Sequence, residues 1–194
     1  MTMAASKTAT VAYPILDLLA RRWSPRAFAA TPVSEDDLKS LFEAARWAPS
    51  CYNDQPWRFI VTRQGSPGFQ KLVEAMGDFN KEWASKAPVL ALATATTHFQ
   101  FNGNPNRFAD YDVGQAIGHL SVQATHKGLV VHQMAGYSKE AAEASFGLQA
   151  KKLNPLALIA IGYAGEAEDL SEALHAKEIQ PRSRLALEAV VSFE

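Results

Sequence analysis

The chain has 194 residues, of which 47% are apolar and 20% charged, and its formal net charge is −1. This length is sufficient for one hydrophobic core and short for two, and the balanced charge excludes a global field that recruits nucleic acid or an anionic membrane. A single cysteine, Cys51, excludes an internal disulfide, and no run approaches the roughly 20 apolar residues of a membrane span. We therefore predict a cytoplasmic protein with a flexible tail over 1–10 and one domain over 11–194.

Helical and strand patterns alternate along the chain without an internal repeat, which is typical of α/β or α+β layers. Pro14 begins a helix that ends near Arg22 and whose leucines have core-facing spacing. Ser34 followed by Asp37 resembles a capping box for a second helix, which ends before Pro49. The pattern then predicts a strand over 57–62, helical structure over 67–86 with a break near residue 77, and a strand from residue 88 that is buried on both faces.

The longest predicted helix spans 112–127 and ends at Gly128. Strands over 129–134 and 154–165 enclose a short helix over 138–148, and residues 188–194 resemble a short terminal strand. No element is predicted over 97–110, and a loop of this length is typical of binding loops and lids. Gly114 and Gly118 lie on one side of the long helix, which favours close packing against a neighbouring helix; two merely tolerated glycines are the alternative.

Several common catalytic motifs are missing from the sequence. The five histidines form no HExxH motif and no i, i+4 pair, so no metal site is predicted. The GxGxxG, phosphate-loop and GxSxG patterns are also absent, and a lone cysteine without a partner histidine is a poor nucleophile. If the protein is an enzyme, its reactive atom therefore belongs to a cofactor.

Four stretches could bind such a cofactor, and each has an ordinary structural interpretation beside the functional one. RRWSPRAF (21–28) is either a cationic helix end that complements the helix dipole or an arginine cradle for a phosphate. APSCYNDQPWRF (48–59) is either a helix-to-strand loop or a set of polar groups that reads the edge of a heterocycle. HQMAGY (132–137) is a strand-end turn or a flat surface for a planar ligand, and PRSRLAL (181–187) is a solvated charge pair or a further basic contact.

Taken together and in this order, these stretches with NKEWASKAPVLAL, YDVGQAIGHL and IGY resemble the nitroreductase family of flavin enzymes, from about residue 13 to the C-terminus. The resemblance implies an α+β fold, a three-layer sandwich with a central, mostly antiparallel sheet flanked by helices. It also implies an intertwined homodimer built around long helices such as 112–127, with FMN bound in clefts at the dimer interface.

The resemblance further implies where FMN would bind. Arg22 and Ser24 would hold its phosphate together with Arg182 or Arg184, and Arg26 would lie beside the N1 and O2 edge of the flavin. The loop over 49–55 would come from the partner chain, and the backbone of 133–136 would approach N5. The complete implied set is Arg22, Trp23, Ser24, Arg26, Pro49, Ser50, Cys51, Asn53, Gln55, Asn80, Gln133, Met134, Ala135, Gly136, Arg182 and Arg184.

The expected activity is ping-pong reduction of nitroaromatic, quinone or similar small electrophiles by NADH or NADPH, with the chemistry at FMN N5 and no catalytic side chain. Arg26 would stabilise the negative charge that develops at N1 and O2. Phe99, Phe101, Phe108 and Tyr111 would line a pocket for an aromatic acceptor or belong to the core. Two positions depart from the family pattern: Trp23 stands where a second basic residue is frequent, and Cys51 where serine is common.

Three alternatives to this activity are compatible with the sequence. The first is a same-fold flavin enzyme with another reaction, such as reductive dehalogenation. The second is a protein that stores or senses FMN without turnover, and the third is a dimer that binds no flavin.

Overall fold

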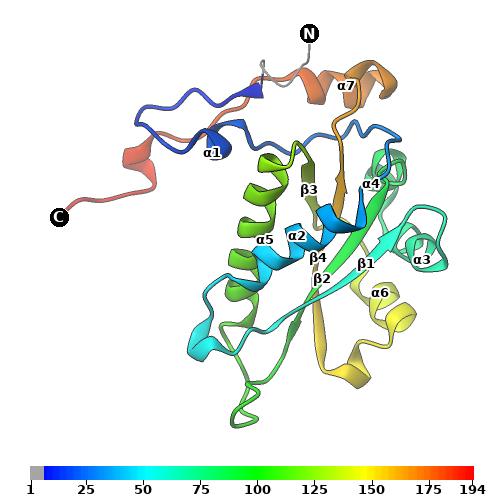
Figure 1. Cartoon of the computed structure of the whole chain (residues 1–194), viewed down its shortest axis with the longest axis vertical. Helices are drawn as coiled ribbons and strands as arrows, with labels where there is room; N and C mark the ends of the chain where they lie inside the picture. Colours follow the sequence, from blue (N-terminus) through cyan, green and yellow to red (C-terminus); the bar gives the residue numbers. More distant parts are fainter. Residues whose placement is uncertain (1–6) are drawn as a thin grey trace.

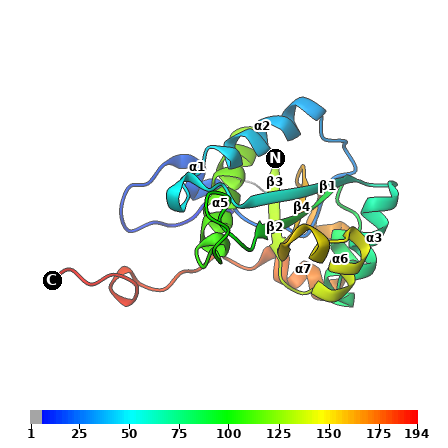
Figure 2. The same cartoon turned by 90° about the horizontal axis from the view of Figure 1, so that it is seen from below.

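A four-stranded antiparallel sheet forms the centre of the computed structural model, which describes residues 7–194 (Figure 1). Its strands are β1 (Trp57–Arg63), β2 (Val89–Thr96), β3 (Val130–Met134) and β4 (Leu153–Gly162), in the spatial order β1-β2-β4-β3. All three pairings are antiparallel. This confirms the predicted α+β class with its antiparallel sheet, which helices flank on both faces (Figure 2).

Strand β2 lies in the middle of the sheet, and its side chains alternate between two separate hydrophobic cores. Val89, Ala91, Ala93 and Ala95 belong to one core, whereas Leu90 and Leu92 belong to the other. Successive side chains of a strand point to opposite faces, so a strand covered on both sides requires a continuous apolar run. The predicted burial of this run on both faces is confirmed.

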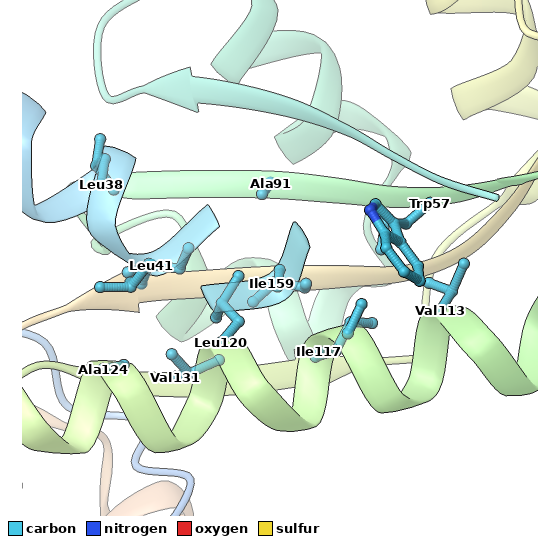
Figure 3. Close-up of a cluster of buried hydrophobic side chains, with 14 of the residues drawn as sticks. Leu38, Leu41, Trp57, Ala91, Val113, Ile117, Leu120, Ala124, Val131 and Ile159 are labelled. Atoms are coloured by element: carbon cyan, nitrogen blue, oxygen red, sulfur yellow. The ribbon is translucent and has the colours of Figure 1, made fainter. Parts of the chain in front are cut away.

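Helices α2 (Glu35–Arg46) and α5 (Ala109–His126) cover the first face of the sheet. Leu41 and Leu120 are fully buried there, and Val113, Ile117 and Ala124 continue the same stripe of α5 (Figure 3). Each buried Leu or Ile side chain contributes about 1.5–3 kcal/mol relative to exposure. Helix α5 is therefore fixed along its length by the sheet on one side.

Helices α3 (Pro67–Ala75), α4 (Asp78–Ala84), α6 (Lys139–Phe146) and α7 (Glu172–Ile179) contribute to the second core. Trp83 is fully buried in this core, stacks on Phe28 at 6.2 Å between ring centroids, and lies 4.4 Å from the His132 ring. The two helices that replace the predicted stretch over 67–86 meet at Gly77, where the break was expected.

Most of the predicted elements are confirmed, and Ser34 is the N-cap of α2, which is one half of the expected capping box. The hydroxyl oxygen of Ser34 accepts from the backbone N–H of Asp37 at 3.0 Å and donates to the Asp37 carboxylate at 2.7 Å. Helix α5 begins three residues before the predicted start, and between 97 and 108 no helix or regular strand forms. None of the helices in residues 7–194 has the length and hydropathy that a membrane span requires.

Two predictions about the chain ends are wrong, and one helix near the C-terminus was missed. Helix α1 (Asp17–Arg21) has only five residues, and Ile15, Leu16 and Leu19 are exposed rather than core-facing. Residues 188–194 form no strand; a 3₁₀ turn, Leu187–Ala189, precedes an extended end that lies away from the body (Figure 2). Helix α7 was not predicted, because its short sequence carries little amphipathic pattern. The apolar side chains that produced these patterns near both chain ends are therefore exposed in the single chain.

Residues 1–10 were predicted to form a flexible tail, and the first six of them lie outside the described residues. Among residues 7–10, Lys7 and Ala9 contact the rest of the chain, whereas Thr8 and Thr10 are exposed. Lys7 is 4% exposed, and the backbone N–H of Ala9 donates to the carbonyl of Ala20 at 2.9 Å.

Candidate functional site

Basic side chains from both ends of the chain line one cavity of about 260 Å³. The blue segment around α1 and the orange-red segment after α7 run beside each other in Figure 1, and Arg182 joins them by donating to the carbonyl of Ala20 at 2.6 Å. The cavity therefore brings together the two basic stretches that the sequence separates by about 160 residues. The charged and polar side chains that line it are Lys7, Arg22, Ser24, Arg26, Lys177, Glu178, Gln180, Arg182 and Arg184.

The cations in this cavity, which we call the arginine cavity, are close enough to repel one another. Burial lowers the pKa of Arg22, and the charges of Arg182 and Arg184 lower it further. The pKa of Arg182 is also lowered, by burial and then by Arg184. Such mutual repulsion is relieved when an anion binds between the guanidinium groups, which makes the cavity suitable for a phosphate.

Arg26 has the most constrained position of these residues. Both oxygens of the Glu178 carboxylate accept from its backbone N–H, at 2.9 and 3.0 Å, and one of them lies 3.8 Å from its guanidinium. Its side-chain Nε is buried and has no hydrogen-bond partner within the part of the chain that the structure describes. A buried donor without a partner costs about 1–3 kcal/mol, and a bound acceptor would remove that cost.

Glu178 itself was not found from the sequence, although it is 2% exposed and also accepts from the backbone N–H of Ala27 at 3.1 Å. It belongs to α7, which was not predicted, and a glutamate in a weakly patterned helix gives no sign of burial. Its carboxylate fixes the backbone that carries Arg26, and it thereby fixes the position of the Arg26 side chain at the arginine cavity.

The end of β3 is tied to this segment by a histidine. Nδ1 of His132 lies 2.8 Å from the carbonyl oxygen of Pro25, which places β3 directly against the segment with Ser24 and Arg26. Burial lowers the pKa of His132 to about 4, and the neighbouring charges of Arg26 and Arg22 add to this. The imidazole is therefore neutral near pH 7 and donates from Nδ1 to the carbonyl.

In the turn after β3, the side chain of Asn80 approaches the backbone of Gly136 closely. The side-chain amide of Asn80 donates to the carbonyl of Gly136 at 3.0 Å, and a Cβ on Gly136 would lie 2.7 Å from the Asn80 nitrogen. Gln133, Ala135 and Gly136 are exposed here, whereas Met134 is buried. The structure thus joins Asn80 to the turn over 133–136, a contact that the sequence did not predict, and leaves Ala135 and Gly136 exposed.

The loop over 49–55 lies elsewhere in the single chain. Figure 1 places this cyan segment at the opposite end of the molecule from the arginine cavity. Tyr52, Asn53 and Gln55 have φ values of 53°, 53° and 51°, a left-handed conformation that side-chain-bearing residues rarely adopt. The residues Pro49, Ser50, Cys51, Asn53 and Gln55 are therefore not brought together with Arg22 by one chain.

Two buried aspartates hold this strained loop in place. Asp112, in the first turn of α5, accepts from the backbone N–H of Cys51 at 3.1 Å. Asp54 accepts from the backbone N–H of Gln100 at 2.8 Å, which links the loop to the 97–108 segment. Both carboxylates are at most 5% exposed, and burial raises the pKa of Asp112. Sequence reasoning missed them because an acid in a polar loop, such as Asp54, or in the first turn of a helix, such as Asp112, is ordinarily solvated.

Aromatic side chains surround the same loop. Tyr52, Phe99 and Phe101 form a cluster with centroid separations of 5.3–6.0 Å, and Tyr52 and Phe101 are 79% and 60% exposed. Tyr52 and Phe101 also line a second, open hollow of about 700 Å³ next to β1. Phe108 and Tyr111 are exposed as well, so a core role for Phe101, Phe108 and Tyr111 is wrong.

Comparisons with known proteins show the family of the chain. Residues 19–163 match the profile of the family described as "Nitroreductase family". The chain belongs to the nitroreductase family. An oxidoreductase solved with FMN is 31% identical, with an alignment over 99% of this chain and 96% of that one and a TM-score of 0.90. A nitroreductase family protein from Clostridium difficile 630 is 25% identical over 94% and 99% of the two chains, with a TM-score of 0.72.

A curated relative, the NADH dehydrogenase of Thermus thermophilus, is 30% identical over 144 residues, which are 72% of this chain and 60% of the relative. As a nitroreductase family member, the chain is an oxidoreductase. The family match ends at residue 163, so Lys7, Glu178, Arg182 and Arg184 lie outside it. Within residues 7–194, no group of three or more His, Cys, Asp or Glu side chains could hold a metal ion.

Proposed function

We propose that this nitroreductase family member uses FMN to transfer electrons from NADH or NADPH to small electrophiles such as nitroaromatics and quinones. The arginine cavity, with four arginines and one carboxylate, is the observation that carries the proposal. FMN ends in a phosphate dianion, and the planar donors of arginine fit phosphate oxygens. The FMN named for the 31% identical oxidoreductase adds support.

Each part of the arginine cavity has a separate task in this proposal. Arg22 and Ser24, whose side chains lie 3.3 Å apart, bind the phosphate together with Arg184. Arg184 donates only to the carbonyl of Ser183 among the described residues, whereas Arg182 is engaged by Lys7 and Ala20 carbonyls. We therefore assign the direct phosphate contact to Arg184 and a bracing role to Arg182.

Bound FMN would supply two-electron chemistry, accepting from NAD(P)H and passing electrons to a second substrate in ping-pong order. Arg26 would stabilise negative charge at the ring edge, because Glu178 holds its cationic group beside the cavity and its Nε has no partner among the described residues. The accessible backbone at Ala135 and Gly136 lies against the flat ring, where any side chain at Gly136 would meet Asn80.

We also propose that the site is completed by a second copy of the chain. Gly114 and Gly118 on α5 have nothing within 4 Å of an added Cβ, so this helix face is open. Leu16, Leu185, Val190 and other apolar side chains at the chain ends are exposed too, and burying them requires a partner. In such a homodimer the strained loop over 49–55 would reach the partner's arginine cavity.

The acceptor would then bind near the aromatic cluster of Tyr52, Phe99 and Phe101. Exposed aromatic rings beside a hollow of about 700 Å³ suit a flat, electron-poor molecule, since offset stacking contributes about 0.5–1.5 kcal/mol per ring pair. This favours nitroaromatic and quinone acceptors over aliphatic ones.

The visible spectrum of the purified protein tests the proposal, recorded before and after anaerobic addition of NADH and then NADPH. We expect a flavin absorbance that bleaches with one or both donors and returns when a quinone is added. Arg22→Met should purify with much less flavin, whereas Arg107→Met, on the 97–108 segment, should retain it. A protein that neither contains nor takes up FMN would refute the proposal, and flavin that no donor reduces would indicate storage without turnover.

A further inference from the structure

Lys7 is a buried cation with no carboxylate within 4 Å among residues 7–194. It is 4% exposed, and it is the only lysine or arginine classed as buried among the described residues. None of the ion pairs within 4 Å in residues 7–194 includes it. Burying an ammonium group costs several kcal/mol unless an anion compensates it, so its position requires an explanation.

The contacts of Lys7 direct its ammonium group to the arginine cavity. Nζ donates to the carbonyl of Gln180 at 2.5 Å, and it lies 5.2 Å from the centre of the Trp23 ring. The same side chain lines the cavity beside Arg22 and Arg184. One carbonyl and one aromatic face leave further ammonium protons for an anion, since lysine carries three donors.

The electrostatic surroundings of Lys7 also favour an anion nearby. Its ammonium group lies over the ring of Trp23, which carries no charge to compensate it. Burial and Arg182 lower the pKa of Lys7, whereas Glu178 raises it, so an incoming dianion would favour the charged lysine.

We propose that Lys7 is a phosphate-binding residue of the cofactor site, supplied by the N-terminal segment that precedes the region matched to the family. This inference rests on the proposed binding of FMN in the arginine cavity. The alternative is that Lys7 only ties the N-terminal segment to Gln180 at the end of α7.

Riboflavin separates the two roles, because it has the same ring system as FMN and no phosphate. Both ligands are titrated into flavin-free protein, and their dissociation constants are measured from the quenching of flavin fluorescence. We expect Lys7→Gln to weaken FMN binding about ten- to hundredfold, the range for one charge-assisted hydrogen bond, and to change riboflavin binding less than about threefold. Lys7→Arg should restore FMN affinity, and Lys39→Gln, on the exposed face of α2, should change neither.

If Lys7→Gln weakens the binding of FMN and riboflavin by the same factor, the inference is overturned and Lys7 only ties the N-terminal segment to Gln180. If Lys7→Gln changes neither affinity, the inference is overturned as well. If wild-type protein binds FMN no more tightly than riboflavin, the phosphate site itself is refuted, which is a separate failure of the proposed function.

A measurement on the wild type keeps the test valid if Lys7→Gln does not fold. The ammonium resonance of Lys7 is followed by nitrogen NMR in lysine-labelled protein, with Lys7→Arg as the assignment control. Inorganic phosphate should move its titration to higher pH. No movement at saturating phosphate would overturn the inference.

Discussion

Acidification should destabilise the protein through His132, whose imidazole is held neutral between Trp83 and the backbone of Pro25. Its pKa is about 4 in the folded protein against an ordinary value of 6.5, because of burial first and the charges of Arg26 and Arg22 next. The unfolded chain therefore takes up a proton near pH 6.5, and the folded chain only near pH 4. At about 1.4 kcal/mol per pKa unit, this difference corresponds to about 3 kcal/mol.

The contribution of His132 is thus fully present above pH 6.5 and is lost as the pH falls from there through 4. The assay is urea unfolding of flavin-free protein at a series of pH values across this window. His132→Asn retains an amide donor for the Pro25 carbonyl but does not titrate, so its free energy of unfolding should fall by about 3 kcal/mol less than that of the wild type. His119→Asn, at an exposed position of α5, controls for the loss of an imidazole.

Identical pH slopes for His132→Asn and the wild type would refute this reasoning. A second consequence ties the effect to the arginine cavity. An anion bound there neutralises Arg22 and Arg26, so phosphate should raise the pKa of His132 and reduce the loss of stability in acid. If phosphate leaves the wild-type slope unchanged, the charges of the two arginines do not act on the imidazole.

Three further substitutions probe the packing and the loop. Gly136→Ala places a Cβ 2.7 Å from a neighbouring amide nitrogen and should lower the free energy of unfolding by about 1 kcal/mol and weaken FMN binding, both measured by titration. Trp83→Ala should destabilise by about 3–5 kcal/mol in urea unfolding, whereas Trp47→Ala, at an exposed position, should cost less than about 1 kcal/mol. Asp112→Ala frees the backbone of Cys51, so thiol modification should become at least about tenfold faster; an unchanged rate would show that the aspartate does not hold the loop.

The elements that were predicted well from the sequence are those whose apolar residues pack in the core of the single chain. The run from Val89 to Thr96 could only be a strand covered on both faces, and the stripe of α5 matched its buried face. Ser34 and Asp37 marked a helix start because their contact is local. Where an element is formed by contacts between residues close in sequence, the sequence pattern was sufficient to predict it.

The predictions failed where contacts span the length of the chain. Lys7 and Gln180 are 173 positions apart, and Glu178 reaches Arg26 across 152. No local pattern reveals that such residues meet. The exposed leucines around α1 misled in the opposite way, because apolar spacing records that a face is buried without recording which chain covers it. The resemblance grouped the basic stretches correctly, but it contained no position for Lys7 or Glu178.

The arginine cavity also has a consequence for the order of events during biosynthesis. One wall comes from residues 7–26 and the opposite wall from residues 177–184, so the cavity does not exist until the second of these segments has been made. Chains emerge N-terminus first, at about 5–20 residues per second. The residues of the sheet and of its first core all precede residue 177, so a nascent chain can assemble them before it can retain a phosphate ligand in the cavity.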